Sequence, residues 1–197
     1  MWDERYSKDG YLFGTEPAAF LTAQATWLPS SGTALAVADG EGRNSVFVAQ
    51  QGLKVTAVDA SPVGVEKAKR LAESAGVSIN FEVADLLTWN WEPEAYDLVV
   101  AIFIQIVGAD ERAVIFDGIK QTLRPGGRLM LHGYRPEQLA YGTGGPPVAE
   151  NMYTNELLAD SFADFTIERL ESYDAEIEEG TGHVGMSALI DLVATKP

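Results

Sequence analysis

The chain alternates between short, continuously apolar runs and longer stretches in which apolar residues recur at helical spacing. A run of four to eight apolar residues is typical of a strand that is buried on both faces of a parallel sheet. Such runs predict strands at residues 33–38, 53–58, 77–83, 96–103 and 128–132. Because helical stretches separate these runs, the pattern indicates an α/β fold with a parallel sheet.

Capping residues set the limits of the predicted helices. Thr15, Ser61 and Thr154 are expected N-caps of helices that end before residue 29, at residue 76 and near residue 162. Further helices are predicted at residues 44–51 and 110–123. The cap positions therefore place one helix between most pairs of consecutive strands.

The C-terminal third departs from this alternation. Residues 124–127 (Arg-Pro-Gly-Gly) predict a turn, and residues 133–153 predict a long loop rich in glycine and proline. Two strands follow at residues 166–177 and 187–195, and the short connection between them makes them antiparallel. We expect a single domain over residues 1–197, in which a hairpin is added to a parallel sheet.

Glycine and polar residues follow the predicted strands at their carboxyl ends. Ligands of open parallel sheets bind at this edge, beside the first strand. The candidate cofactor-binding residues lie at four successive strand ends: Asp39, Gly40, Glu41, Gly42, Arg43, Asn44, Asp59, Ala60, Ala84, Asp85, Leu86 and Phe103. Each residue taken alone is also explained by a structural role in a turn, but the occurrence of all of them at successive strand ends favours an adenosine-type ligand.

Two of these side chains have expected partners on such a ligand. Asp59 is expected to accept hydrogen bonds from both hydroxyls of a ribose, and Asp85 from an adenine amino group. The glycines let the backbone approach the ligand closely.

Charge and composition exclude several classes of function. The chain has 14 Lys and Arg against 29 Asp and Glu, a net charge of −15, which disfavours nucleic acid and anionic membranes as partners. The absence of Cys excludes disulfides, thiolate–zinc sites and thiol nucleophiles. No signal peptide and no membrane span are predicted, so we expect a cytoplasmic protein.

Five stretches, in order along nearly the whole chain, resemble class I S-adenosylmethionine-dependent methyltransferases: ALAVADGEGRNSVFVA, VTAVDAS, VADL, YDLVVAIF and LRPGGRLML. The nearest likeness is to small bacterial proteins grouped with the tellurite-resistance and thiol methyltransferases. These are similar in the WDERY start, in YxxGTEP at residues 11–17, in YGTGGPP at residues 141–147 and in EGxGHxG at residues 179–185.

The resemblance implies a Rossmann-like, doubly wound sheet of seven strands. The implied order is 3-2-1-4-5-7-6, with the last strand antiparallel and helices on both faces. It also implies S-adenosylmethionine as cofactor, S-adenosylhomocysteine as product, no metal, and a small molecule as the methyl acceptor. We expect a monomer or a weak homodimer.

Two positions depart from the family pattern. Ala36 stands at the usual acidic position and Ala38 at the first glycine position, while Asp39 lies in the turn. We therefore expect Asp39, or a backbone carbonyl, to hold the methionine amine of the cofactor.

The candidate catalytic residues are His183, His132 and Tyr11. His183 lies in the C-terminal hairpin and is expected to orient or deprotonate the acceptor, with the acidic neighbours Glu178 and Glu179 raising its pKa. His132 follows the fifth strand, and Tyr11 is a candidate for orienting the substrate. Each of the three has a structural role as its alternative. Residues 1–28 and 133–153 are expected to close over the site.

Two other functions compete with methyl transfer. A nicotinamide-dependent oxidoreductase would use the same nucleotide site, although Ser45 stands at the third glycine position of the GxGxxG fingerprint and no Tyr-x-x-x-Lys pair follows. A non-catalytic module that binds an adenosyl ligand is the second alternative.

Overall fold

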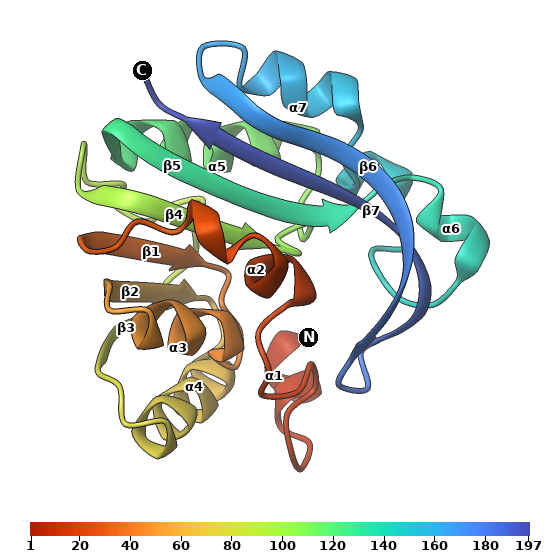
Figure 1. Ribbon diagram of the computed structural model, residues 1–197. Helices are drawn as coiled ribbons and strands as arrows, with labels where there is room; N and C mark the ends of the chain where they lie inside the picture. The colour runs from red at the N-terminus through yellow and green to blue at the C-terminus, as the bar shows by residue number, and fades with distance from the viewer.

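The computed structural model describes residues 1–197, and its centre is one seven-stranded sheet of order β3-β2-β1-β4-β5-β7-β6 (Figure 1). The neighbours among β1 to β5 pair in parallel, and β7 is antiparallel to both β5 and β6. The predicted strand order and the antiparallel last strand are thereby confirmed. The strands are β1 (Thr33–Val37), β2 (Lys54–Asp59), β3 (Ile79–Val83), β4 (Tyr96–Ile102), β5 (Leu123–Tyr134), β6 (Thr166–Glu179) and β7 (His183–Thr195).

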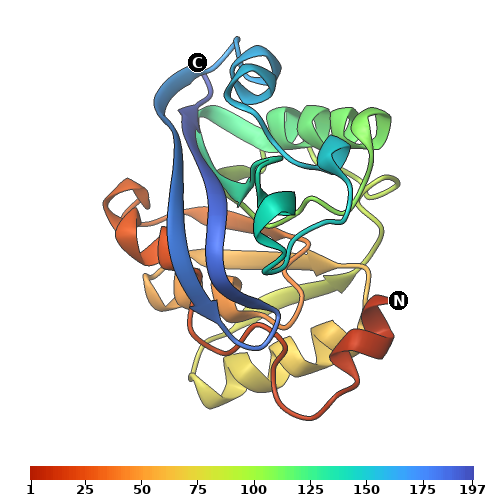
Figure 2. The same ribbon diagram turned by 90° about the vertical axis from the view of Figure 1, so that its right-hand side faces the viewer.

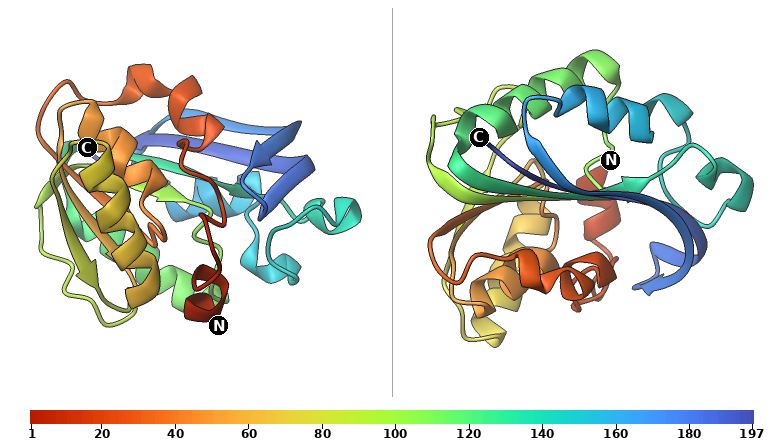
Figure 3. Two further views of the ribbon diagram at one scale, coloured as in Figure 1. Left: turned by 90° about the horizontal axis from the view of Figure 1, so that it is seen from below. Right: turned by 45° about the horizontal axis from the view of Figure 1, so that its top comes forward.

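Helices cover both faces of the sheet (Figure 3). On one face lie α2 (Ala19–Ala23), α3 (Arg43–Gln50) and α4 (Pro62–Ser74), and on the other lie α5 (Ala109–Thr122) and α7 (Asn155–Ser161). The remaining short elements are α1 (Trp2–Tyr6), η1 (Ala25–Trp27), α6 (Gln138–Tyr141) and η2 (Ala149–Asn151). None of the helices is long and apolar enough to cross a membrane.

Alternate residues of the central strands enter two separate cores. In β4, Val99 and Ala101 pack in the core shared with α5 and α7, whereas Leu98 and Val100 pack in the core shared with α2 and α3. A strand that is buried on both faces needs apolar residues at every position. This requirement explains why the apolar runs located the central strands to within a few residues.

The N-terminal region differs from the prediction. Thr15 caps no helix, and the expected helix over residues 15–28 is replaced by α2 and the 3₁₀ helix η1. The start of α2 is fixed by distant side chains, since Asn44 accepts from the Ala18 amide at 2.9 Å and Glu179 from the Ala19 amide at 3.0 Å. The prediction of one long helix was wrong because these tertiary hydrogen bonds override the local capping signal.

The C-terminal third also departs from the prediction in its boundaries. β5 begins at Leu123, so residues 124–127 form an irregularity within the strand, and the pairing with β4 shifts register there. The predicted loop over residues 133–153 contains α6 and η2. The β6–β7 hairpin turns within residues 180–182, so Glu179 and His183 lie opposite each other in the ladder. Thr154 and Ser61 do cap their helices, as expected.

The long hairpin connects the sheet to the N-terminal segment, residues 1–14. β6 and β7 curve away from the sheet, and their turn lies against this segment (Figure 2). The amides of Thr181 and Gly182 donate to the Leu12 carbonyl at 2.9 and 3.0 Å. The N-terminal segment and the turn of the β6–β7 hairpin therefore meet beside the carboxyl ends of β1 and β4, where the strand order reverses.

Candidate functional site

A cavity lies at the carboxyl ends of β1, β2 and β4, and we call it the first cavity. It contains about 940 Å³ of space between protein atoms, including the part open to solvent. All the predicted cofactor-binding residues line it except Gly42, namely Asp39, Gly40, Glu41, Arg43, Asn44, Asp59, Ala60, Ala84, Asp85, Leu86 and Phe103. The rule that ligands bind at strand ends therefore located this cavity.

Asp59 ends β2 and is buried at the base of the first cavity. One carboxylate oxygen accepts from the Gly40 amide and the other from the Ser61 amide, each at 2.8 Å. Burial is the largest influence on this carboxyl and raises its pKa, against the two amides, which lower it. The residue holds together the turns that follow β1 and β2, and it lines the cavity as well.

Asp39 follows β1 and holds the start of α3. Its carboxylate accepts from the Ser45 hydroxyl at 2.5 Å and from the Ser45 amide at 3.2 Å. Burial raises the pKa of Asp39 to about 6, with a further contribution from Asp59, although the Ser45 hydroxyl opposes the shift. A carboxyl with such a pKa is stabilised as the anion by a cation, so the site favours a positively charged ligand group here.

Two residues at the reversal point adopt left-handed backbone conformations. Ala38 after β1 has φ +47° and Phe103 after β4 has φ +55°. This conformation costs a residue with a side chain about 1–3 kcal/mol and is often found at functional sites. Phe103 was predicted from its place after a strand. Ala38, which also lines the first cavity, was missed because alanine carries no chemical signal.

Three predicted cofactor-binding residues are engaged by the N-terminal region. Glu41 accepts from the Leu12 amide at 2.7 Å and also pairs with Lys67 of α4 at 2.8 Å. Arg43 donates to the Glu16 carbonyl at 3.5 Å and also pairs with Glu179 of β6 at 2.7 Å. Asn44 accepts from the amide ahead of α2. Their side chains line the first cavity while fastening the segment that covers it.

Gly42 has a packing role. A Cβ placed on Gly42 would lie 2.7 Å from the Cβ of Ala68 in α4. Its backbone is also left-handed, with φ +91°. Any side chain at this position would therefore push α3 away from α4.

The helix α1 covers the glycine turn, and sequence reasoning did not find it. A Cβ placed on Gly40 would lie 2.7 Å from the Tyr6 hydroxyl oxygen, and Trp2 and Tyr6 line the first cavity. The Asp3 carboxylate accepts from the Ser61 hydroxyl. Only five residues form this helix, so no periodic pattern could have predicted it.

His183 lies between the first cavity and the hairpin and lines the cavity. Its ring packs against Phe13, Phe103 and Tyr134, with centroid separations of 4.3, 4.4 and 5.6 Å. Burial lowers the pKa of His183 more than the neighbouring Glu179 raises it. Glu179 does raise the pKa of His183, as expected, but the predicted net increase was wrong because it overlooked the burial of the ring.

Glu179 is 3.6 Å from His183 and also carries the Arg43 ion pair. Burial on its own would raise the pKa of Glu179, but His183, the Arg43 guanidinium and the Ala19 amide together lower it to about 2. The Glu179 carboxylate is therefore ionised, and the positive charge of Arg43 compensates its negative charge. It joins the hairpin to α3 and to the start of α2.

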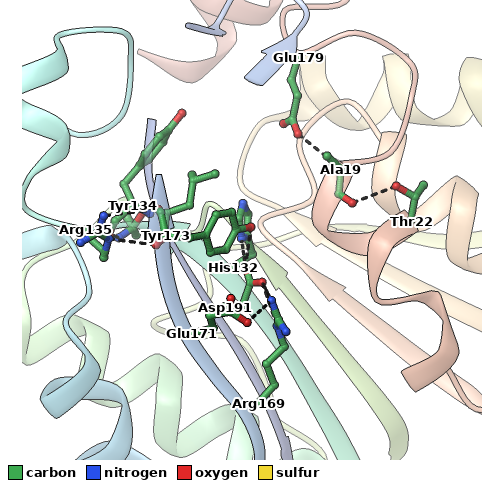
Figure 4. A network of polar contacts seen from close by, with 12 residues as sticks. Ala19, Thr22, His132, Tyr134, Arg135, Arg169, Glu171, Tyr173, Glu179 and Asp191 are labelled. Atoms are coloured by element: carbon green, nitrogen blue, oxygen red, sulfur yellow. Dashed lines mark hydrogen bonds and ion pairs between the residues drawn. The ribbon is translucent and has the colours of Figure 1, made fainter. Parts of the chain in front are cut away.

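The other two candidate catalytic residues do not line the cavity. His132 is buried, and its Nδ1 lies 2.7 Å from Asp191, which also accepts from Arg169 at 3.0 Å and from the Tyr173 hydroxyl at 3.1 Å (Figure 4). This network ties β5, β7 and β6 together. The Tyr11 hydroxyl donates to the Lys67 carbonyl at 3.3 Å. In this structure His132 helps to hold the strands together, and Tyr11 holds the N-terminal segment against α4.

A second cavity adjoins the first, and it is lined by residues from both predicted lid regions. Trp2, Phe13, Phe103, Ile106 and His183 line both cavities. The second cavity is further bounded by Met1, Arg5, Gln105, Tyr134, Gly144, Gly145, Pro146, Pro147, Asn151 and Gly182. Two connected spaces, one beside the glycine turn and one beyond Phe103, suit a reaction between two ligands.

Comparison with known proteins bears on this arrangement. Residues 34–127, which contain β1 to β4 and most of the first cavity, match the sequence model of the methyltransferase domain. Carboxy-S-adenosyl-L-methionine synthase of Vibrio parahaemolyticus serotype O3:K6 is 31% identical over 119 residues, which are 60% of this chain and 44% of that relative. The chain therefore covers less than half of the relative's length.

Several solved structures share the fold of this protein. One comes from work on the conversion of a disulfide bond into a thioacetal group during echinomycin biosynthesis, with a TM-score of 0.78, 20% identity, and coverage of 98% of this chain and 89% of that chain. Another is the N-methyltransferase NodS from Bradyrhizobium japonicum WM9 in complex with S-adenosyl-L-homocysteine, with a TM-score of 0.73, 14% identity, and coverage of 100% and 96%.

One further solved structure bears on the predicted likeness to the tellurite-resistance group. TehB from Haemophilus influenzae has a TM-score of 0.72 at 16% identity and covers 90% of this chain and 61% of that chain. At such identity the likeness shows the fold alone. The likeness to the tellurite-resistance group therefore stays a prediction from the sequence motifs.

Proposed function

We propose that this protein is a class I S-adenosylmethionine-dependent methyltransferase that transfers a methyl group to a small-molecule acceptor. The observation that carries the proposal is the pair of carboxylates, Asp39 and Asp59, at the end of an apolar slot where the strand order reverses. Carboxylates suit the hydroxyls and the ammonium group of such a cofactor, and the slot suits its base.

The residues present fit the cofactor. Asp59 is placed to receive the ribose hydroxyls, and Asp39, with its raised pKa, the ammonium group. Leu86 and Leu87 line the part of the first cavity that takes the adenine, beside the exposed carboxylate of Asp85. The cofactor, when bound, supplies a methyl group on a positively charged sulfur, which makes the methyl carbon open to a nucleophile.

The chain itself supplies orientation and exclusion of water. The N-terminal segment is fastened over the first cavity through Glu41 and through the hairpin turn. Closing a reactive group away from water prevents its hydrolysis. Holding the acceptor at near-attack distance contributes roughly 7–11 kcal/mol to lowering the barrier.

The oxidoreductase alternative is disfavoured by the turn itself. Ser45 occupies the third glycine position of the nicotinamide fingerprint, and its hydroxyl hydrogen is shared between Asp39 and the Gly42 carbonyl. A dinucleotide pyrophosphate would have to bring two negative charges beside Asp39 and Asp59, which is electrostatically unfavourable.

Calorimetric titration with S-adenosylmethionine, S-adenosylhomocysteine and NADH tests the proposal. We expect the first two to bind at one site and NADH to give no heat of binding. A panel of small acceptors, assayed for release of S-adenosylhomocysteine, then tests catalysis. Tight binding of NADH without binding of S-adenosylhomocysteine would establish the oxidoreductase, and binding without turnover on any acceptor would favour a non-catalytic binding module.

A further inference from the structure

The second cavity contains polar atoms that lack partners. The Tyr134 hydroxyl is buried and makes no hydrogen bond within the protein. The Nδ1 of His183 also makes none, but it lies 3.6 Å from the Glu179 carboxylate. Buried polar groups without a partner are rare, so the Tyr134 hydroxyl points to a missing ligand. Tyr134 and His183 both line the second cavity, with exposed fractions of 1% and 7%.

Tyr134 and His183 lie close together at the second cavity. A Cβ placed on Gly144 would lie 3.7 Å from the Tyr134 hydroxyl oxygen and 3.9 Å from the His183 Cδ2. Cδ2 is on the edge of the imidazole that carries Nε2, whereas Nδ1 faces Glu179. The Tyr134 ring points away from the network of His132 and Asp191, towards the hairpin (Figure 4).

The lining of the second cavity indicates the chemical nature of the non-polar part of the ligand. Trp2, Phe13, Phe103 and Tyr134 present aromatic rings, and Pro146 and Pro147 complete the wall. Flat aromatic and proline surfaces favour a planar ring through stacking. The space therefore suits a small aromatic molecule better than a flexible polar one.

The charge of the second cavity excludes cationic acceptors. No carboxylate lines it, although the chain as a whole carries a net charge of −15. Arg5 is its one permanently charged side chain, and burial lowers the pKa of His183. An amine that bound here as a cation would have no anionic partner.

We propose that the second cavity is the acceptor site, and that it takes a small aromatic acceptor bearing a hydroxyl or thiol group, held by the Tyr134 hydroxyl and the His183 imidazole. This inference rests on the proposed function and adds the acceptor class and Tyr134. The acceptor oxygen or sulfur bonds to the methyl carbon. The acceptor proton passes to neutral His183, and the electron pair of the broken sulfur–methyl bond stays on the thioether product.

The test measures binding, so that it does not depend on turnover. We would titrate 4-chlorophenol, 4-chlorothiophenol and 4-chlorotoluene into the protein, with and without S-adenosylhomocysteine. The toluene has the same ring without the protic group. We expect the wild type to prefer the phenol or the thiophenol over the toluene by about three- to tenfold, the value of one to two hydrogen bonds between neutral groups.

The variants assign this preference to single groups. Tyr134→Phe keeps the ring that packs against Gly145 and removes the hydroxyl alone, so we expect it to fold and to lose most of the preference. The matched control is Tyr141→Phe, because the Tyr141 hydroxyl is exposed and bonds Asp174 outside both cavities. Affinity for S-adenosylhomocysteine should change by less than twofold in both variants.

His183→Ala supplies the kinetic readout. With 4-chlorophenol as acceptor, we expect the kcat of this variant to be about 100-fold lower than that of the wild type. We also expect that the kcat of the wild type decreases at low pH and that the kcat of the variant does not. The proposal is overturned if Tyr134→Phe keeps the full preference, if the wild type binds the toluene as well as the phenol and thiophenol, or if these two displace S-adenosylhomocysteine. Failure of S-adenosylhomocysteine to bind would count against the proposed function instead.

Discussion

Replacing Asp59 with alanine separates the binding role of this carboxylate from its structural role. If it accepts both ribose hydroxyls, its loss removes charge-assisted hydrogen bonds of about 1.5–3 kcal/mol, and affinity for S-adenosylhomocysteine should fall roughly 10- to 150-fold. The same change leaves the Gly40 and Ser61 amides without their partners at 2.8 Å. We therefore also expect the free energy of unfolding to fall by about 1–3 kcal/mol.

Asp97→Ala is the matched control for the structural part of this effect. Asp97 accepts from the Thr33 amide at 2.8 Å and from Arg124 at 2.8 Å, at the amino ends of β1 and β4, opposite the first cavity. We expect a similar loss of stability with unchanged affinity.

The assay for both variants is calorimetric titration with S-adenosylhomocysteine at a temperature well below either midpoint of unfolding. Equal losses of affinity in the two variants, or wild-type affinity in Asp59→Ala, would refute the ribose assignment.

Three further predictions concern charge and closure. Because the pKa of Asp39 is raised to about 6, affinity for S-adenosylhomocysteine should weaken by up to about tenfold per unit as pH falls below 6, and calorimetry of Asp39→Asn should show no such dependence. Gly180→Ala would place a Cβ 2.4 Å from the backbone of the N-terminal segment, whereas at Gly126, with similar positive φ, nothing lies within 4 Å; hydrogen exchange in that segment should accelerate in Gly180→Ala and stay unchanged in Gly126→Ala. Since the pKa of Glu179 is lowered to about 2, the stability that it contributes is present above about pH 4.5 and is lost as pH falls towards 2. Denaturant unfolding should therefore show that Glu179→Gln is less stable than the wild type at pH 7, and that the difference in free energy of unfolding becomes smaller below pH 4.5.

Much of the fold was predictable because the central strands are buried on both faces. β1 and β4 need apolar residues at every position, so their sequences differ plainly from the helices beside them. The N-terminal helices were mispredicted because their positions depend on Asn44 and Glu179, which are distant in sequence. The hairpin was underestimated in length because the exposed positions of β6 are mostly acidic, so no continuous apolar run marks where this strand ends.

Only those residues of the candidate site that directly follow a strand could be predicted from the sequence. Asp39, Asp59 and Phe103 follow strands directly, so topology alone brings them together. Trp2 and Tyr134 reach the cavities through packing that no local pattern records. The pKa of His183 was mispredicted for the same reason, since its burial depends on rings from three separate segments.

A crystal structure of the protein with S-adenosylhomocysteine tests the central claim most directly. The account predicts the adenosine in the first cavity, with the ribose hydroxyls on Asp59, the amino group near Asp39, and the sulfur beside Phe103, facing the second cavity. The account would be contradicted by a ligand that lies in the second cavity or by one that makes no contact with Asp59.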